Sequence, residues 1–204
     1  MNTTTGTLKS ICLFCGSSPG LDPAFRAAAA ELGTTLARNS IRLIYGGGHV
    51  GLMGVAADAC LAAGGDVVGV IPRKLMEKEV GHAGLTQMHV VETMHERKAL
   101  MTQLSDGFIA LPGGFGTLDE LFEALTWQQL AYHFLPVGVL NVSGFFNHLV
   151  QFLDHARDQR LLREAHRDTL LVDTDLNALI ARMRGFVPPN NEKWLDRAAK
   201  ESIV

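Results

Sequence analysis

Long apolar runs and cysteines are both scarce in this sequence. No stretch approaches the roughly 20 apolar residues that a membrane-spanning helix needs, and the polar start MNTTTGTLKS has no apolar signal core. Three cysteines among 204 residues do not make a disulfide framework and are typical of a reducing compartment. We therefore expect a cytoplasmic protein that does not bind membranes.

A block of basic residues is also missing. The chain has 18 Lys and Arg against 21 Asp and Glu, which gives a net charge of -3. Surfaces for nucleic acid or anionic lipid concentrate Lys and Arg, so this balance favours a small neutral or anionic metabolite as the partner and no nucleic acid.

Patterns typical of a metal site are absent too. The eight histidines form no H-E-x-x-H or comparable cluster along the sequence, so we expect no catalytic metal. Cys12 and Cys15 do form a C-x-x-C, but they lie in KSICLFC, a strand-like run. Residues three apart on a strand point to opposite faces, which favours buried structural cysteines over a redox or zinc pair.

Short β-rich runs alternate with amphipathic stretches along most of the chain. This alternation predicts an α/β fold, a Rossmann-like doubly wound parallel sheet with helices on both faces. We expect one domain over residues 1–204, with a core from about 9 to 183 and a C-terminal arm at about 187–204 that lies at the periphery or against a partner subunit. The segments are 10–16, 25–39, 41–47, 52–64, 66–72, 88–93, 95–105, 107–114, 117–133, 136–142, 145–159, 169–173 and 175–183.

Three glycine-bearing turns follow predicted strands: CGSSPG (15–20), YGGGHVGLMG (45–54) and PGGFGT (112–117). In an open parallel sheet such turns lie at the carboxyl edge, where ligands bind. Glycine allows positive φ and close approach, and the N–H groups of a helix N-terminus favour an anion. Any one of these turns is explained equally well by tight turning alone, but three at one edge favour a nucleotide or phosphosugar.

The second turn matches G-x-G-x-x-G at Gly46, Gly48 and Gly51, the dinucleotide fingerprint. That fingerprint also needs an acidic residue at the carboxyl end of the next strand, whereas DVVGVIPRK ends in Pro-Arg-Lys and carries Asp66 at its start. NAD binding, as in an NAD-linked oxidoreductase, is therefore an alternative and not the first choice.

The third turn is followed by a glutamate with two interpretations. Thr117 and Glu120 form T-x-x-E, the pattern of a helix-capping box, and Thr93 and Glu96 repeat it before the preceding helix. A catalytic role is the other interpretation. Asp119 is expected to be a first-turn acid on the solvent side.

Arg97 is the expected partner of Glu120. It lies three and four residues before Leu100 and Met101, on the helix stripe that should face the sheet, so its guanidinium should point into the crevice. We expect the strands that precede these two helices to be adjacent, because they are consecutive in sequence. A structural ion pair is the alternative to a catalytic one.

The helix after the third turn has two distinct faces. Leu118, Leu121, Phe122 and Leu125 form its predicted core stripe, whereas Glu120, Glu123 and Trp127 share another face. Trp127 is then either exposed at a dimer contact or part of the core.

Four motifs together resemble one known family. CGSS (15–18), YGGGHVGLMG (45–54), MHERK (94–98) and PGGFGTLDE (112–120) are similar to those of the LONELY GUY family, cytokinin riboside 5′-monophosphate phosphoribohydrolases, which are sometimes mislabelled lysine decarboxylases. The similarity covers about Lys9 to Met183. It implies a Rossmann-type homodimer that hydrolyses the N-glycosidic bond of an adenosine 5′-monophosphate, with or without an N6 substituent, and releases free base and ribose 5-phosphate without a cofactor.

The resemblance also implies roles for particular residues. Arg97 and Glu120 are the implied catalytic pair. Because positive charge develops on the ribose ring during glycosidic cleavage, we expect Glu120 to stabilise the sugar cation or position the attacking water. Arg97 would orient the ribose phosphate or Glu120 itself, or favour the departing base. The expected substrate- and phosphate-binding positions are Ser18, Gly46, Gly47, Gly48, Gly51, Met53, Gly54, Met94, Lys98, Pro112, Gly113, Gly114, Gly116 and Thr117.

Two further activities remain possible at this point. A decarboxylase would use a lysine Schiff base, and the only suitably directed lysine is Lys98, which we expect at the crevice rim, turned about 100° from Arg97. A non-catalytic nucleotide or cofactor carrier on the same fold is the other alternative.

Overall fold

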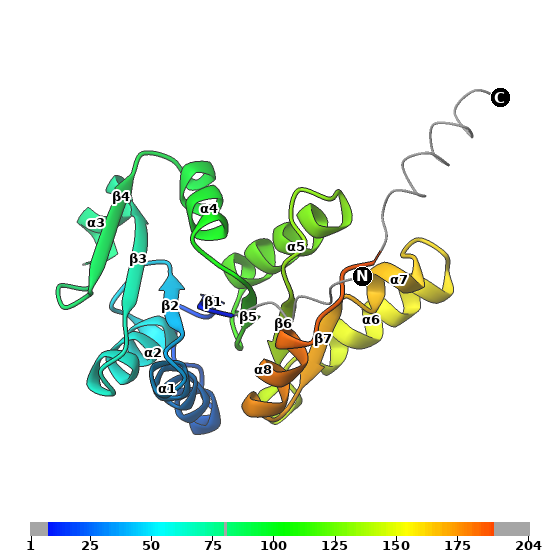
Figure 1. Cartoon of the computed structure of the whole chain (residues 1–204), viewed down its shortest axis with the longest axis horizontal. Coiled ribbons are helices and arrows are strands. Elements are labelled where there is room, and N and C mark those ends of the chain that lie inside the picture. Colours follow the sequence, from blue (N-terminus) through cyan, green and yellow to red (C-terminus); the bar gives the residue numbers. More distant parts are fainter. Residues whose placement is uncertain (1–7, 80, 190–204) are drawn as a thin grey trace.

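Seven parallel strands form one sheet in the computed structural model, which describes residues 8–79 and 81–189 and, for residues 77–79, the backbone only. The strands lie in the order β4-β3-β2-β1-β5-β6-β7 (Figure 1). Their bounds are β1 (Ser10–Phe14), β2 (Arg42–Tyr45), β3 (Val67–Pro72), β4 (Gln87–Val91), β5 (Phe108–Ala110), β6 (Val137–Leu140) and β7 (Leu170–Asp173).

Helices connect the strands and cover both faces of the sheet, which confirms the predicted doubly wound α/β fold. Two short helices, at 73–79 and 164–167, had not been predicted. The helices are α1 (Pro23–Arg38), α2 (Gly51–Ala62), α3 (Arg73–Glu79), α4 (Met94–Gln103), α5 (Phe115–Gln129), α6 (Asn147–Asp158), α7 (Glu164–Arg167) and α8 (Leu176–Arg184), with a 3₁₀ turn η1 (Val142–Gly144).

Alternating side chains of β1 divide the core into two layers. Ile11 and Leu13 pack with residues of α1, α2 and α8, whereas Cys12 and Phe14 pack with residues of α4, α5 and α6. Figure 1 shows these two groups of helices on opposite sides of the sheet. Cys15 belongs to the first layer, and both cysteines are buried free thiols, as predicted from their spacing.

The predicted adjacency of the strands before Arg97 and Glu120 is wrong. β4 lies at one edge of the sheet, and β3, β2 and β1 separate it from β5. The chain reverses its direction of strand addition between β4 and β5, so β5 pairs with β1 instead. This reversal places the carboxyl ends of β1 and β5 at the switch point where doubly wound folds bind ligands.

Two further expectations from the sequence concern membrane spans and the C-terminal arm. A helix with the length and hydrophobicity of a membrane span is absent from the part of the chain that the structure describes. The predicted C-terminal arm lies almost entirely outside the described residues, which end at 189.

Candidate active site

The first turn of α4 positions Arg97. Thr93 is the N-cap residue, and its hydroxyl accepts a hydrogen bond from the Glu96 N–H at 3.1 Å. The Glu96 carboxylate returns to the N–H of Glu92 at 2.9 Å, one residue before the cap. The predicted capping pattern therefore does start this helix, and it fixes the first turn on which Arg97 lies.

The guanidinium of Arg97 is held on three sides. Its Nε donates to the carbonyl of Val70 on β3 at 3.2 Å, and its Nη1 lies 3.6 Å from Oε1 of Glu120. A Cβ added to Gly46 would lie 2.0 Å from Nη2, so only glycine leaves room for the guanidinium there. The side chain is 12% exposed, as expected for an arginine that points into the crevice.

Glu120 lies on α5 and does not cap that helix. Gly114 is the N-cap residue, so Thr117 is already inside the helix, where it is buried. The predicted capping box at Thr117 and Glu120 is therefore wrong, because a cap residue must lie at the boundary with non-helical backbone. Without this structural role, the Glu120 carboxylate faces Arg97.

Burial raises the pKa of Glu120, and the nearby Arg97 offsets part of that rise. The side chain is 12% exposed, so the charged carboxylate loses most of its hydration. A charged carboxylate with little hydration interacts strongly with a positive charge that develops nearby.

The three predicted glycine turns meet at this edge of the sheet. The Gly16 N–H donates to the Pro112 carbonyl at 3.0 Å, which joins the first turn to the third. Gly51 has φ +63°, and a Cβ there would lie 2.2 Å from the carbonyl carbon of Ser17, so the second turn packs directly on the first. Their assembly at one edge was predicted.

A cleft of about 260 Å³ opens between these turns. Arg97 and Glu120 lie in its wall, and the N-terminus of α5 borders it. The first N–H groups of a helix have no acceptor within the helix, so they can bind an anion here. The lining residues are Cys15, Gly16, Ser17, Met53, Leu75, Arg97, Gly114, Phe115, Gly116, Thr117 and Glu120.

The predicted binding residues fall into three groups. Met53, Gly114, Gly116 and Thr117 line the cleft. A second group supports the wall: Gly46 beside Arg97, Gly51 against Ser17, Gly113 against Thr117, Pro112 bonded to Gly16, and Met94 with its sulfur 3.9 Å from Arg97 Nη1. A third group makes other contacts: Ser18, Gly47, Gly48, Gly54 and Lys98.

Some cleft residues were not predicted. Ser17 and Gly16 belong to the CGSS motif and could have been assigned from it. Leu75 lies on α3, a helix that was not predicted because Pro-Arg-Lys resembles the end of the preceding strand. Phe115 is 93% exposed at the first position of α5, and nothing in its sequence context distinguished it.

Lys98 points to the other side of Glu120. Its Nζ lies 3.1 Å from Asp119 and 3.0 Å from Glu123, and its side chain is 13% exposed. It is therefore more enclosed than the predicted rim position. Burial works against its charge, but the hydrogen bonds with Glu123 and Asp119 outweigh burial and raise the pKa of Lys98. Asp119 is solvent-exposed as predicted, although it lies beyond the first turn of α5.

The two predicted faces of α5 are only partly correct. Glu120, Glu123 and Trp127 do share a face, where they line a narrow pocket with Lys98. The fully buried stripe, however, is Thr117, Leu121, Ala124 and Gln128. The polar Gln128 can be buried there because its side-chain amide donates a hydrogen bond to the Leu135 carbonyl at 2.7 Å. The predicted core residues Leu118, Phe122 and Leu125 are only half-buried, as is Trp127.

Asp66 lies at the opposite edge of the sheet, next to Arg42 at 3.8 Å. It borders a hollow of about 580 Å³ at the amino ends of β1, β2 and β3. The acidic residue that could hold an NAD ribose is therefore on the wrong side of the sheet from the glycine turns, as its place in the sequence had indicated.

Comparison with known proteins gives two kinds of match. Residues 53–183 match a family model described as possible lysine decarboxylase. A cytokinin riboside 5′-monophosphate phosphoribohydrolase of Arabidopsis thaliana is 44% identical over 180 residues, which cover 88% of this chain and 84% of that protein. One from Rhodococcoides fascians is 45% identical over 179 residues, which cover 87% and 90%.

Solved structures share the fold at lower identity. The molybdenum cofactor carrier protein of Chlamydomonas reinhardtii superposes with a TM-score of 0.64 at 21% identity, over 87% of this chain and 98% of that one. The molybdenum cofactor binding protein of Rippkaea orientalis gives 0.62 at 22%, over 86% and 96%. These two structures show the fold alone.

Proposed function

The chain belongs to the family of cytokinin riboside 5′-monophosphate phosphoribohydrolases, and from this premise we propose how its cleft cleaves a nucleotide. The enzyme hydrolyses the N-glycosidic bond of an adenosine 5′-monophosphate and releases the base and ribose 5-phosphate. The observation that carries the mechanism is the Arg97–Glu120 pair, buried in the wall of a cleft that the N-terminus of α5 borders.

The 5′-phosphate binds at the N-terminus of α5. Gly114, Gly116 and Thr117 line the cleft there, and Gly114 and Gly116 have open space where a Cβ would be. Phosphate oxygens can therefore approach the backbone N–H groups, and the positive end of the helix dipole favours their charge. Gly113 supports this turn by leaving room for Thr117.

The ribose then lies beside Glu120. Cleavage breaks the bond between C1′ and the base nitrogen, and the electron pair leaves with the base. Positive charge develops on the ribose ring in the transition state, as in other glycosidic cleavages. The ionised Glu120 carboxylate, largely removed from water, stabilises this charge more than it stabilises the neutral sugar of the ground state. Water adds its hydroxyl to C1′, and its proton goes to the base.

Arg97 keeps Glu120 ionised and in place. Its positive charge lowers the pKa of Glu120 against the effect of burial. The 3.6 Å separation of Nη1 and Oε1 is longer than a hydrogen bond, so the carboxylate oxygen remains able to contact a substrate. The hydrogen bond to Val70 fixes the guanidinium independently of Glu120.

The base lies toward the apolar side chains at the mouth of the cleft. Leu75 and Phe115 line this region, and the 42%-exposed Met94 lies next to Arg97. Such side chains suit a flat purine and an apolar N6 substituent. Comparing AMP with isopentenyladenosine monophosphate identifies the preferred base.

The decisive experiment measures base release by the wild type and by Glu120→Gln, with Asp119→Asn as the matched control. Asp119 is the adjacent carboxylate, but its side chain is 63% exposed and does not line the cleft. We expect Glu120→Gln to be slower by roughly 10²-fold or more, the size typical for the loss of a key charge, and Asp119→Asn to stay within about threefold. Equal activity of Glu120→Gln and wild type would exclude the mechanism, and no release by either would favour a non-catalytic carrier.

We further propose that the protein forms a homodimer in the cytoplasm. Tyr132 and Phe134 follow α5 and are 77% and 52% exposed, and exposed aromatic side chains of this kind can be covered at a subunit contact. The free thiols fit a reducing compartment. Analytical ultracentrifugation of wild type and Tyr132→Glu tests the dimer, and cell fractionation tests the compartment.

A further inference from the structure

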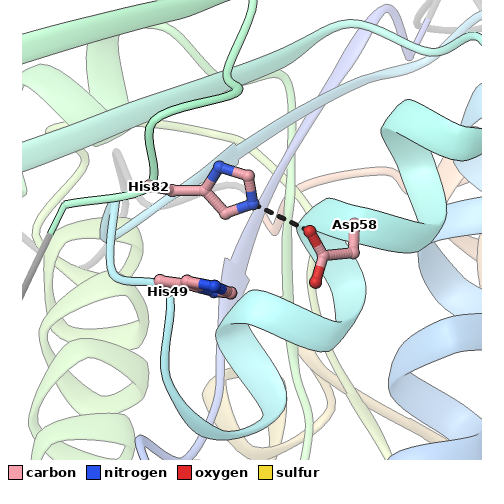
Figure 2. Close-up of side chains that lie close together, drawn as sticks. All are labelled: His49, Asp58 and His82. Atoms are coloured by element: carbon pink, nitrogen blue, oxygen red, sulfur yellow. Dashed lines mark hydrogen bonds and ion pairs between the residues drawn. The ribbon is translucent and has the colours of Figure 1, made fainter.

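Three side chains that are distant in sequence meet at the second glycine turn. His49 lies in the turn between β2 and α2, Asp58 lies on α2, and His82 lies between α3 and β4. One nitrogen or oxygen of each lies within 4.8 Å of the others. Figure 2 shows the two imidazole rings and the carboxylate gathered around one space.

Backbone contacts hold the two histidine-bearing segments together. The His82 N–H donates to the Gly47 carbonyl at 3.0 Å, and Gly48 pairs with Gly81 in an antiparallel bridge. The His82 side chain is 8% exposed, and its Nε2 lies 2.9 Å from Oδ1 of Asp58. The fold therefore holds the two histidine-bearing segments together and encloses His82, whereas His49 and Asp58 are exposed.

The contact between His82 and Asp58 could be a structural hydrogen bond and nothing more. That explanation leaves out His49, whose ring lies 5.1 Å from the His82 ring at a 55° tilt. Within the part of the chain that the structure describes, the His49 imidazole makes no hydrogen bond or ion pair, and the residue is exposed. A ring nitrogen of His49 is therefore available to bind a ligand.

We propose that His49, Asp58 and His82 bind a divalent transition-metal ion, with zinc as the best-suited ion. Two imidazoles and one carboxylate are a donor set that zinc prefers, with solvent in the fourth position. Zinc bonds of about 2.0–2.2 Å place neighbouring donors about 3.3–3.5 Å apart in a tetrahedron. His82 Nε2 and Asp58 Oδ1 are slightly closer than this, at 2.9 Å, and all three donor atoms lie within 4.8 Å of one another. The exposed His49 side chain can move to reach the ion.

Binding changes two hydrogen bonds of His82 in a defined way. The Nδ1 of His82 accepts from the Gly84 N–H at 3.1 Å, so in the metal-free protein the ring proton lies on Nε2 and points to Asp58. An ion on Nε2 displaces that proton, and the neutral ring then carries its proton on Nδ1, opposite the Gly84 N–H. Ala83 and Gly84 are exposed, so this loop can turn away.

The site is separate from the catalytic cleft. None of its three residues lines the cleft, and its ion would join the turn that contains Gly46 to the segment before β4. The proposal therefore does not depend on the reaction assigned to the enzyme, and it predicts a metal that braces the second glycine turn.

Calorimetric titration of the chelator-treated full chain with Zn²⁺ tests the site, and Co²⁺ supplies a visible spectrum that reports its ligands. We expect one ion per chain, a higher melting temperature with zinc, and at least tenfold weaker binding in both His49→Ala and Asp58→Asn. Asp58→Asn retains an oxygen that can accept from His82, and His49→Ala removes no described hydrogen bond, so both variants should fold. His155→Ala, an exposed histidine on α6, is the matched control and should bind like the wild type.

A second readout is the Gly84 amide signal in NMR spectra, which should shift in the wild type and not in His49→Ala at a zinc concentration that saturates the wild type alone. Absence of saturable binding by the wild type overturns the proposal. So does wild-type affinity in either His49→Ala or Asp58→Asn, because a site elsewhere on the chain would then be responsible.

Discussion

Nη1 of Arg97 lies 3.6 Å from Oε1 of Glu120, and both side chains are 12% exposed. At this separation, and with little water nearby, the two charges interact strongly. The distance is too long for a hydrogen bond, so the carboxylate oxygen can still accept one from another group. In the mechanism that we propose, Glu120 supplies a charge to the substrate and Arg97 favours its ionised form.

The first prediction concerns the acid limb of the pH profile. Burial raises the pKa of Glu120 and Arg97 counteracts it, so the active, ionised form should be lost at a pH above the ordinary glutamate value of 4.5. Removing the counteracting charge in Arg97→Met should move the acid limb of the residual kcat/KM to higher pH. Arg42→Met, which alters an exposed pair at the other edge of the sheet, should leave the limb in place. An unchanged limb in Arg97→Met would show that Glu120 does not control it.

Gly46→Ala should reduce activity while the protein remains folded. The new Cβ would lie 2.0 Å from Nη2 of Arg97, at the far end of a flexible side chain that can swing aside. Displacing the guanidinium should lower kcat/KM by roughly 10- to 100-fold, because small errors in position are costly at catalytic groups. Gly185→Ala, whose Cβ meets only atoms at 3.8 Å, is the control. Wild-type activity in Gly46→Ala would show that the position of Arg97 is not critical.

Tyr45→Phe should stabilise the protein. The Tyr45 hydroxyl is fully buried and has no hydrogen-bond partner among the described residues, so folding removes it from water without compensation. We expect the free energy of unfolding in urea to rise by about 1 kcal/mol. Tyr132→Phe, at a 77%-exposed position, should change it little. A clear loss of stability in Tyr45→Phe would mean that a buried water satisfies the hydroxyl.

Lys98 should not act as a Schiff-base lysine. Its hydrogen bonds with Glu123 and Asp119 raise its pKa, so the amine stays protonated and a poor nucleophile. After incubation with pyridoxal phosphate and borohydride, mass spectrometry should find less adduct at Lys98 than at the exposed Lys9, and added lysine should release no carbon dioxide. Preferential labelling of Lys98 would support the decarboxylase description of the family model.

The expectations that held depend on local patterns. β1 and β2 are short apolar runs, and Thr93 precedes its helix with the spacing of a cap, so both kinds of element follow from neighbouring residues. The glycine turns lie at one edge because parallel strands connected by helices place all such turns there.

The expectations that failed required information from distant parts of the chain. Nothing near Phe108 indicates that β5 pairs with β1 instead of β4, because strand order depends on contacts across the whole sheet. Thr117 has the sequence of a cap, but α5 starts earlier, at Phe115, after the turn that Gly16 and Pro112 join. His49 and His82 are 33 positions apart along the chain, and the bridge between Gly48 and Gly81 and the hydrogen bond from the His82 N–H to the Gly47 carbonyl bring them together.

The sequence was enough to predict all seven strands, most of the helices, the glycine turns and the family, because each of these depends on residues close together or on motifs at fixed spacing. It was not enough to predict the short helices α3 and α7. The folded structure was needed to establish that Glu120 faces Arg97 instead of its helix cap, that Lys98 is ion-paired with Asp119, and that two histidines and an aspartate meet at the second glycine turn. The physical reason is that the charge state and partners of a side chain depend on burial and distance, which arise only when remote segments pack together.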